Sequence, residues 1–351
     1  MCRIKKLVLV STVTVVSLAG CSASGPAKVG DDAQIVDAVD GMIEHLQRQN
    51  LPALKAVETW RNDYGPGLKL TTEHYQVYTT LLDPLMLSQV PGFLESAYRG
   101  YNDQMPERIE TQTRFPVYLF ADRQQWDAFT KTFAGPQAPT YSRIKAGAYS
   151  LKGACVAYNI GRERTFSVLG HEGWHQFSSR HFKFRLPSWL DEGIAMLFEV
   201  SRYENGLFYF EPGRNIYRLG DLKRTLTEKR MIPLRDLIAM NPGEVLAANE
   251  TMAVTGFYSQ AYALVRFLRE EGYGKRLGNY RRLLLDGLAG EWPLTEAGRR
   301  IAGDRNIPLT VQWNRAVAPR LFEHYFGIDA GEIEQEYLAF CGKIVYHVHF
   351  R

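Results

Sequence analysis

The sequence predicts an α+β protein with a small sheet in its N-terminal part and a C-terminal part that is helical throughout. Two patterns lead to this fold class. Segments with the two-residue alternation of strands lie among helical segments before residue 160, and one hairpin signal follows at 203–210. Beyond that hairpin, apolar residues recur with helical spacing. With 351 residues, 45% of them apolar, the chain is long enough to bury a sizeable core.

The predicted elements follow one another along the chain. A helix is expected from Asp32 to Trp60, because its apolar residues keep helical spacing. Gly153 interrupts a later strand pattern, and Asn205-Gly206 is a typical hairpin turn. The expected strands cover 75–78, 116–120, 146–158 and the two arms of 203–210. The other expected helices cover 84–101, 123–132, 165–180, 218–229, 233–239, 256–271, 275–287 and 330–345.

The N-terminus has the three parts of an export signal. Arg3, Lys5 and Lys6 form a positive head, and residues 7–17 form an apolar run too short to span a bilayer. The run leads into Leu-Ala-Gly-Cys ending at Cys21, which resembles a bacterial lipobox, whose cysteine carries the lipid anchor. The alternative is an ordinary signal peptide followed by a chance cysteine.

The lipobox implies a place in the cell. Residues 1–20 are expected to be the signal peptide, and 21–31 are a polar, breaker-rich tether. Ser22 after the cysteine resembles an outer-membrane address, so we expect a lipid-anchored envelope protein facing the periplasm. The membrane is then a partner through the acyl chains alone.

Charge argues against a nucleic-acid partner. The formal net charge is +4, and three of the positive charges belong to the signal, which has no acidic residue. The remainder of the chain is close to neutral, so it has no basic excess for binding phosphate.

Two cysteines remain after the signal and the anchor are set aside. Cys155 and Cys341 can pair in an oxidising compartment, or they can be two separately buried thiols. The sequence leaves both possibilities open.

The segment that carries chemistry is Leu-Gly-His171-Glu172-Gly-Trp-His175. On a helix, residues four apart lie on one face, so His171 and His175 can bind one metal ion together. Glu172 lies beside the first ligand and can reach a water at the metal without ligating it, as a general base requires.

A second segment supplies a third ligand. It reads Trp189-Leu-Asp-Glu192-Gly-Ile-Ala, and sixteen residues separate His175 from Glu192. This distance allows a helix to end, the chain to turn and a second helix to bring a carboxylate back. Two histidines and one glutamate leave the fourth zinc position open, which is typical of catalytic sites.

These two segments resemble the active-site core of the gluzincin metallopeptidases, in the MA clan of peptidases. They are most similar to bacterial peptidases whose second motif is Trp-Leu-x-Glu-Gly-x-Ala. The resemblance implies a zincin-like fold. A helical segment at 32–68 would precede an α+β lobe at 69–213 that carries the zinc-binding helix. A helical lobe would follow at 214–351, with the active-site cleft between the two lobes.

The resemblance also implies roles for single residues. His171, His175 and Glu192 would bind one Zn²⁺ ion, and Glu172 would be the catalytic base. Glu199 lies seven residues after Glu192, on the same helical face, and would support a ligand through a hydrogen bond. The alternative for Glu199 is a solvated surface charge.

A third segment, Phe-Tyr258-Ser-Gln-Ala-Tyr262 and the apolar run after it, resembles the helix that carries the catalytic tyrosine of the clan's aminopeptidases. Tyr258 would stabilise the oxyanion, with Tyr262 as the second candidate. The alternative is that both are core tyrosines. The Gly-x-Met-Glu-Asn segment with which those aminopeptidases bind the substrate's amino terminus is absent, which favours an endopeptidase.

We therefore expect a zinc metallopeptidase that hydrolyses a peptide or protein substrate in the envelope. In the gluzincins the substrate lies antiparallel to an edge strand, and residues 146–158 are the candidate strand. One alternative is a peptidase-like lipoprotein that no longer cleaves and instead binds or scaffolds an envelope partner. Another is hydrolysis of a different amide, such as a cell-wall crosslink.

Overall fold

The structure, a computed structural model, describes residues 30–144, 147–242, 251–305 and 311–348. The protein is a mixed α+β chain, 58% helical, with a small mixed sheet and many helices, which confirms the predicted class. The signal, the lipobox cysteine Cys21 and residues 22–29 of the tether lie outside the described residues. The predicted end of the tether at residue 31 is wrong, because α1 begins at Gly30. None of the described helices is long and apolar enough to cross a membrane.

The first half of the chain alternates between strands and helices. The strands are β1 (Ala56–Thr59), β2 (Leu68–Thr71), β3 (Tyr75–Thr79), β4 (Phe115–Phe120), β5 (Ala148–Leu151), β6 (Ala154–Tyr158), β7 (Ser201–Glu204) and β8 (Leu207–Phe210). The helices up to β7 are α1 (Gly30–Arg48), α2 (Pro84–Asn102), α3 (Arg123–Phe133), α4 (Ala138–Tyr141), α5 (Arg162–His181) and α6 (Ser188–Ala195), with 3₁₀ turns at Gly135–Gln137 and Met196–Phe198.

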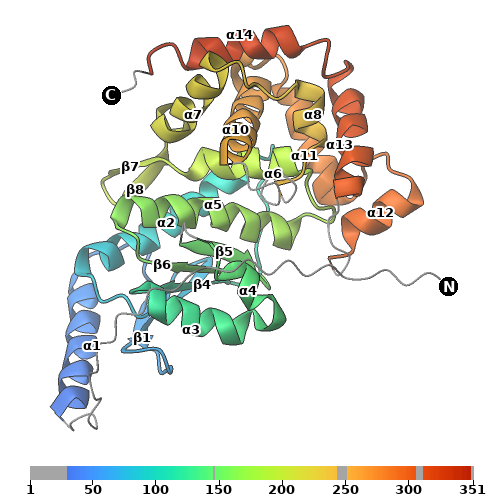
Figure 1. The fold of residues 1–351 in the computed structure, drawn as a ribbon. Coiled ribbons are helices and arrows are strands. Elements are labelled where there is room, and N and C mark those ends of the chain that lie inside the picture. Colours follow the sequence, from blue (N-terminus) through green and yellow to red (C-terminus); the bar gives the residue numbers. More distant parts are fainter. Residues whose placement is uncertain (1–29, 145–146, 243–250, 306–310, 349–351) are drawn as a thin grey trace, which may run out of the picture.

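After β8 the described chain is helical. A 3₁₀ turn at Pro212–Arg214 leads into α7 (Ile216–Thr227), α8 (Leu234–Ala239), α10 (Thr251–Gly274), α11 (Leu277–Ala289), α12 (Glu296–Gly303), α13 (Val311–Phe326) and α14 (Glu334–Ile344). Figure 1 shows these helices gathered on the side of α5 and α6 that faces away from the sheet.

The main sheet has six strands in the order β1-β2-β3-β4-β6-β5. The central pairs β3–β4 and β4–β6 are parallel, and the outer pairs are antiparallel. The short β5 therefore forms one edge of the sheet. Strands β7 and β8 form a separate hairpin, whose turn residues Asn205 (φ 52°) and Gly206 (φ 82°) confirm the predicted Asn-Gly turn.

Strand β4 shows how the sheet separates two cores. Successive side chains of a strand point to opposite faces. Phe115, Val117 and Leu119 belong to the large core, on the face that α2 and α5 cover. Tyr118 and Phe120 pack on the other face in a smaller aromatic cluster with α3. Helix α5 thus lies between the sheet on one side and α6 on the other, with the C-terminal helices beyond α6 (Figure 1).

The predicted helix from Asp32 to Trp60 is too long. Helix α1 ends at Arg48, and β1 lies within the range that was expected to be helical. Strand β2 begins at Leu68, the last residue of the helical segment expected at 32–68. Pro52 has no N–H to continue a helix, which agrees with the early end. The two strands were missed because each has four residues, too few for an alternating pattern to be distinguished from helical spacing.

Two other differences concern short or proline-containing elements. The predicted strand 146–158 is a hairpin, in which Lys152 (φ 51°) and Gly153 (φ 75°) form the turn between β5 and β6. Helices α12 and α13 were not predicted. α12 has eight residues, and α13 contains Pro319, which normally ends a helical pattern.

Candidate metal centre

Helix α5 brings the two motif histidines to the same side. The Nε2 atoms of His171 and His175 lie 3.3 Å apart, as expected for residues four apart on a helix. Both side chains are largely buried, with 15% and 19% of their surface exposed. Each side chain therefore keeps a small exposed fraction.

Helix α6 brings the third predicted ligand to the same point. Glu192 Oε2 lies 3.3 Å from His171 Nε2 and 3.7 Å from His175 Nε2. The three atoms all lie within 4.8 Å of one another, and this is the one group of potential metal-binding side chains found among the described residues. The structure therefore gathers the three residues that the sequence selected as ligands.

Two glycines allow the helices to approach this closely. A Cβ atom added at Gly170 would lie 2.2 Å from the carbonyl oxygen of Phe198. One added at Gly193 would lie 2.6 Å from the carbonyl oxygen of Ala261 and 2.5 Å from Val265 Cγ2. Because side chains cannot fit at these positions, the backbone of α5 meets the 3₁₀ turn Met196–Phe198 and the backbone of α6 meets that of α10, each directly beside a ligand.

Glu199 contacts the first ligand, His171, at the ring nitrogen that faces away from the other two ligands. Its Oε1 lies 3.1 Å from His171 Nδ1. Arg218 on α7 forms two hydrogen bonds with the same carboxylate, of 2.9 and 2.6 Å, and Asn215 Nδ2 donates a third of 2.8 Å. Glu199 is therefore a buried, paired carboxylate rather than a solvated helix charge.

Asp191 makes the corresponding contact to the second ligand, and the sequence analysis missed it. Asp191 Oδ2 lies 3.1 Å from His175 Nδ1, while Oδ1 accepts hydrogen bonds from Trp174 Nε1 (2.8 Å) and Ser178 Oγ (3.2 Å). Its position directly before Glu192 was a usable signal, because a carboxylate there shares the ligand's helix. Arg218 gave no such signal.

The charges of the site stabilise one another. Burial alone would raise the pKa of the Glu192 carboxyl, but His175 and His171 hold it well below its ordinary value. Burial likewise opposes ionisation of Glu199, but Arg218 and His171 lower its pKa to about 2. Burial lowers the pKa of His171, but Glu192 and Glu199 outweigh it and raise the pKa to about 9.

Glu172 differs from these two glutamates. Burial raises the pKa of its carboxyl above the ordinary value, and the two histidines only partly oppose this shift. The backbone N–H of Ser150 hydrogen-bonds its carboxylate and stabilises the charged form. A carboxylate with a raised pKa is the more effective proton acceptor, so its environment suits a general base.

The two tyrosines of α10 have different surroundings. Burial raises the pKa of Tyr258, and the nearby charge of Glu192 raises it further. The guanidinium carbon of Arg218 lies 5.5 Å from its ring centroid. The Tyr262 hydroxyl instead donates to the carbonyl oxygen of Pro212 and accepts from Arg266. Tyr262 is thus committed to the backbone, whereas Tyr258 stands beside the metal-site carboxylates.

Cys155 and Cys341 are both free thiols, buried on β6 and α14. Of the two possibilities that the sequence left open, the structure shows separate buried thiols.

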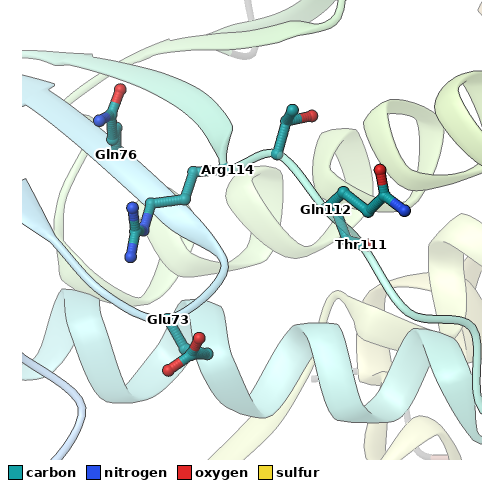
Figure 2. A pocket seen from close by; sticks show the side chains of 6 residues that line it. Glu73, Gln76, Thr111, Gln112 and Arg114 are labelled. Atoms are coloured by element: carbon teal, nitrogen blue, oxygen red, sulfur yellow. The ribbon is translucent and has the colours of Figure 1, made fainter.

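A surface pocket lies elsewhere on the molecule. Figure 2 shows its polar lining, which comes from the turn before β3, from β3 and from the segment leading into β4. The lining residues are Glu73, Gln76, Thr111, Gln112, Thr113 and Arg114. No predicted site residue lines it.

Comparisons of the chain with family models, with curated proteins and with solved structures found no match. Function is therefore inferred from the site itself.

Proposed function

We propose that the protein is a zinc-dependent metallopeptidase of the gluzincin type, with His171, His175 and Glu192 as the ligands. The observation that carries the proposal is the spacing of the three ligand atoms, which is 3.3, 3.3 and 3.7 Å. Bonds of about 2.0–2.1 Å to a tetrahedral zinc ion place neighbouring ligand atoms about 3.3–3.4 Å apart. Two of the three spacings lie in this range and the third is slightly longer, which supports zinc as the ion.

The donor set supports a catalytic ion rather than a structural one. Structural zinc sites are closed by four ligands and usually include thiolates. The donors here are two imidazoles and one carboxylate, and no described cysteine joins them. Each histidine also has a carboxylate on its Nδ1, the arrangement that orients ligating imidazoles in zinc enzymes.

In the proposed reaction, His171, His175 and Glu192 would hold a zinc ion, which would supply a Lewis acid for the attacking water and the substrate carbonyl. Glu172 accepts the proton of the attacking water and later donates it to the leaving amine. The Tyr258 hydroxyl donates a hydrogen bond to the oxyanion of the tetrahedral intermediate. The high pKa of Tyr258 keeps this hydroxyl protonated and able to donate at neutral pH.

The edge strand β5 supports a peptide as the substrate. The N–H of Tyr158 donates to the carbonyl oxygen of Gly147, and the register pairs Tyr149 with Val156. In an antiparallel pair, alternate residues direct their N–H and C=O groups away from the partner strand. Ala148 and Ser150 are these residues. The N–H of Ser150 is hydrogen-bonded to Glu172, so the N–H and C=O of Ala148 and the C=O of Ser150 are the groups at the open edge, where an extended peptide can add as a further strand.

We also propose that the chain has the zincin-like arrangement, in which the active-site cleft lies between a mixed N-terminal lobe and a helical C-terminal lobe. The contacts of α5 with the sheet and of α6 with α10 support it. The proposed lipid-anchored location at the outer membrane depends on the lipobox resemblance alone. An endopeptidase is favoured, because the segment that binds a substrate's amino terminus in the related aminopeptidases is absent.

The experiment is a zinc and activity measurement on the full chain purified in detergent. We expect about one zinc ion per chain and hydrolysis of casein that stops with a chelator and returns with zinc. His171→Ala and His175→Ala should each remove the metal and the hydrolysis. Stoichiometric zinc in the double variant would refute the site, and zinc without any amide hydrolysis would favour the non-cleaving scaffold.

A further inference from the structure

The Asp191 carboxylate uses its two oxygens for two different tasks. Oδ1 accepts the hydrogen bonds from Trp174 Nε1 and Ser178 Oγ, and Oδ2 faces His175 Nδ1 at 3.1 Å. Glu199, which faces the other ligand histidine, is instead held by the charged Arg218. The orientation of the His175 ring thus depends on the Asp191 carboxylate, which in turn accepts a hydrogen bond from Trp174.

Trp174 determines which atom of the residue-191 side chain faces its indole N–H. An indole N–H can donate a hydrogen bond but cannot accept one. The Trp174 ring is fully buried and stacks on Phe177 and Phe198, so it cannot turn away. The atom opposite its Nε1 must therefore be an acceptor. The Ser178 hydroxyl imposes no such condition, because it can donate and accept.

We propose that Asp191 is a positioning residue that holds His175 in the tautomer with the proton on Nδ1, leaving Nε2 free to ligate the metal, and that Trp174 fixes the orientation of Asp191. This inference rests on the proposed function. A carboxylate on Nδ1 accepts that proton, fixes the ring and makes Nε2 a better ligand. Because Asp191 and Glu192 are consecutive, α6 delivers a ligand and the support of another ligand together.

The geometry predicts an unusual order of effects for substitutions. In Asp191→Asn the amide oxygen must face Trp174, so the amide NH₂ must face His175 Nδ1. A donor there favours the tautomer with the proton on Nε2, which removes the ligating lone pair. Asp191→Ala removes the support but imposes no wrong tautomer. The nearly isosteric amide should therefore bind zinc more weakly than the alanine variant.

The second consequence is a rescue. Trp174→Phe removes the donor that prevents the amide from turning over. In the double variant Asp191→Asn, Trp174→Phe, the amide oxygen can face His175 and the ligating tautomer returns. We expect the double variant to bind zinc at least about tenfold more tightly than Asp191→Asn, because losing the supporting partner of a ligand costs about 10–100-fold in affinity.

The test is the zinc dissociation constant of the full chain in detergent, measured at one pH by competition with a chromophoric chelator. The variants are the wild type, Asp191→Ala, Asp191→Asn, Trp174→Phe and the double variant, each checked for folding by thermal melting. We expect Asp191→Asn to be the weakest, with a loss of about 100-fold. Asp191→Asn binding as tightly as Asp191→Ala would overturn the inference, even if the tryptophan variants do not fold.

The same measurement distinguishes failure of the proposed zinc site from failure of the proposed role of Asp191. If the wild type binds no zinc, the proposed function and this inference both fail. If the wild type binds zinc and Asp191→Asn binds within threefold of it, the metal site stands and the role of Asp191 is wrong. A double variant that folds but binds no better than Asp191→Asn would refute the role of Trp174.

Discussion

At the scale of single residues, the pKa of His181, the last residue of α5, is shifted by its surroundings. Its Nε2 lies 2.8 Å from Thr111 Oγ1, and its ring packs against Phe115 and Phe177. Burial and the neighbouring charge of Arg180 lower its pKa to about 4. The folded protein therefore holds His181 neutral where an unfolded chain would protonate it.

This shift predicts a loss of stability in mild acid. Because the folded pKa lies below the unfolded value of about 6.5, the contribution is complete above pH 6.5 and is lost as pH falls toward 4. Between pH 7 and pH 5, His181→Gln should lose less stability than the wild type, by about 1 kcal/mol after discounting for partial exposure. Urea midpoints at both pH values measure this, with His45→Gln on the exposed face of α1 as the control. Equal losses in the wild type and His181→Gln would contradict the assignment.

At the scale of elements, the site is assembled by helices that touch backbone to backbone. Gly193→Ala should force α6 away from α10, because the added Cβ would lie 2.5 Å from Val265 Cγ2. Overpacking of this kind costs about 1–3 kcal/mol. Since Glu192 is the adjacent residue, zinc affinity should fall as well.

Gly220 on α7 provides the matched control. An added Cβ there meets no atom within 4 Å, so Gly220→Ala should stabilise the helix by about 0.5–1 kcal/mol. Thermal melting and zinc titration of both variants make the comparison. A Gly193→Ala protein as stable as Gly220→Ala would show that α6 and α10 do not meet as described.

The limits of sequence reasoning also lie at this scale. His171 and His175 could be paired from the sequence, because their distance is fixed by one helix. The contact of Arg218 with Glu199 depends on where α7 packs against the site, which no local pattern encodes, whereas the position of Asp191 directly before Glu192 was a local signal. Strands β1 and β2 and the proline-containing α13 were missed for a related reason, because packing in the core stabilises them against weak or contrary local signals.

At the scale of the whole molecule, we propose that the tether predicted at 21–31 joins the folded part of the chain to a lipid anchor. The lipobox resemblance predicts attachment through the acyl chains at Cys21, each buried CH₂ contributing about 0.8 kcal/mol.

Cys21→Ser should release the protein from the membrane fraction without changing its fold or its zinc content. The physical reason is that the lipobox precedes a tether whose polar, breaker-rich composition predicts a flexible segment. Membrane fractionation followed by thermal melting of the released protein measures both. A Cys21→Ser protein that stays with the membrane would mean that another part of the molecule holds it there.

We assign different roles to Glu172 and Glu192, two largely buried glutamates whose charges both interact with His171 and His175. Glu192 Oε2 lies 3.3 and 3.7 Å from the two ligand nitrogens, whereas the Glu172 carboxylate is held by the Ser150 backbone. Glu192→Gln should therefore weaken zinc binding first and lose activity as a consequence. Glu172→Gln should keep its zinc and lose about 10²–10⁴-fold in rate, the usual contribution of a general base.

The direct measurement is zinc content and peptide hydrolysis of Glu172→Gln and Glu192→Gln, side by side with the wild type. The proposed mechanism predicts a zinc-loaded, inactive Glu172→Gln protein and a zinc-depleted Glu192→Gln protein. Loss of the metal in Glu172→Gln with full zinc in Glu192→Gln would reverse the two roles. Full metal and full activity in both would place the active site elsewhere in the molecule.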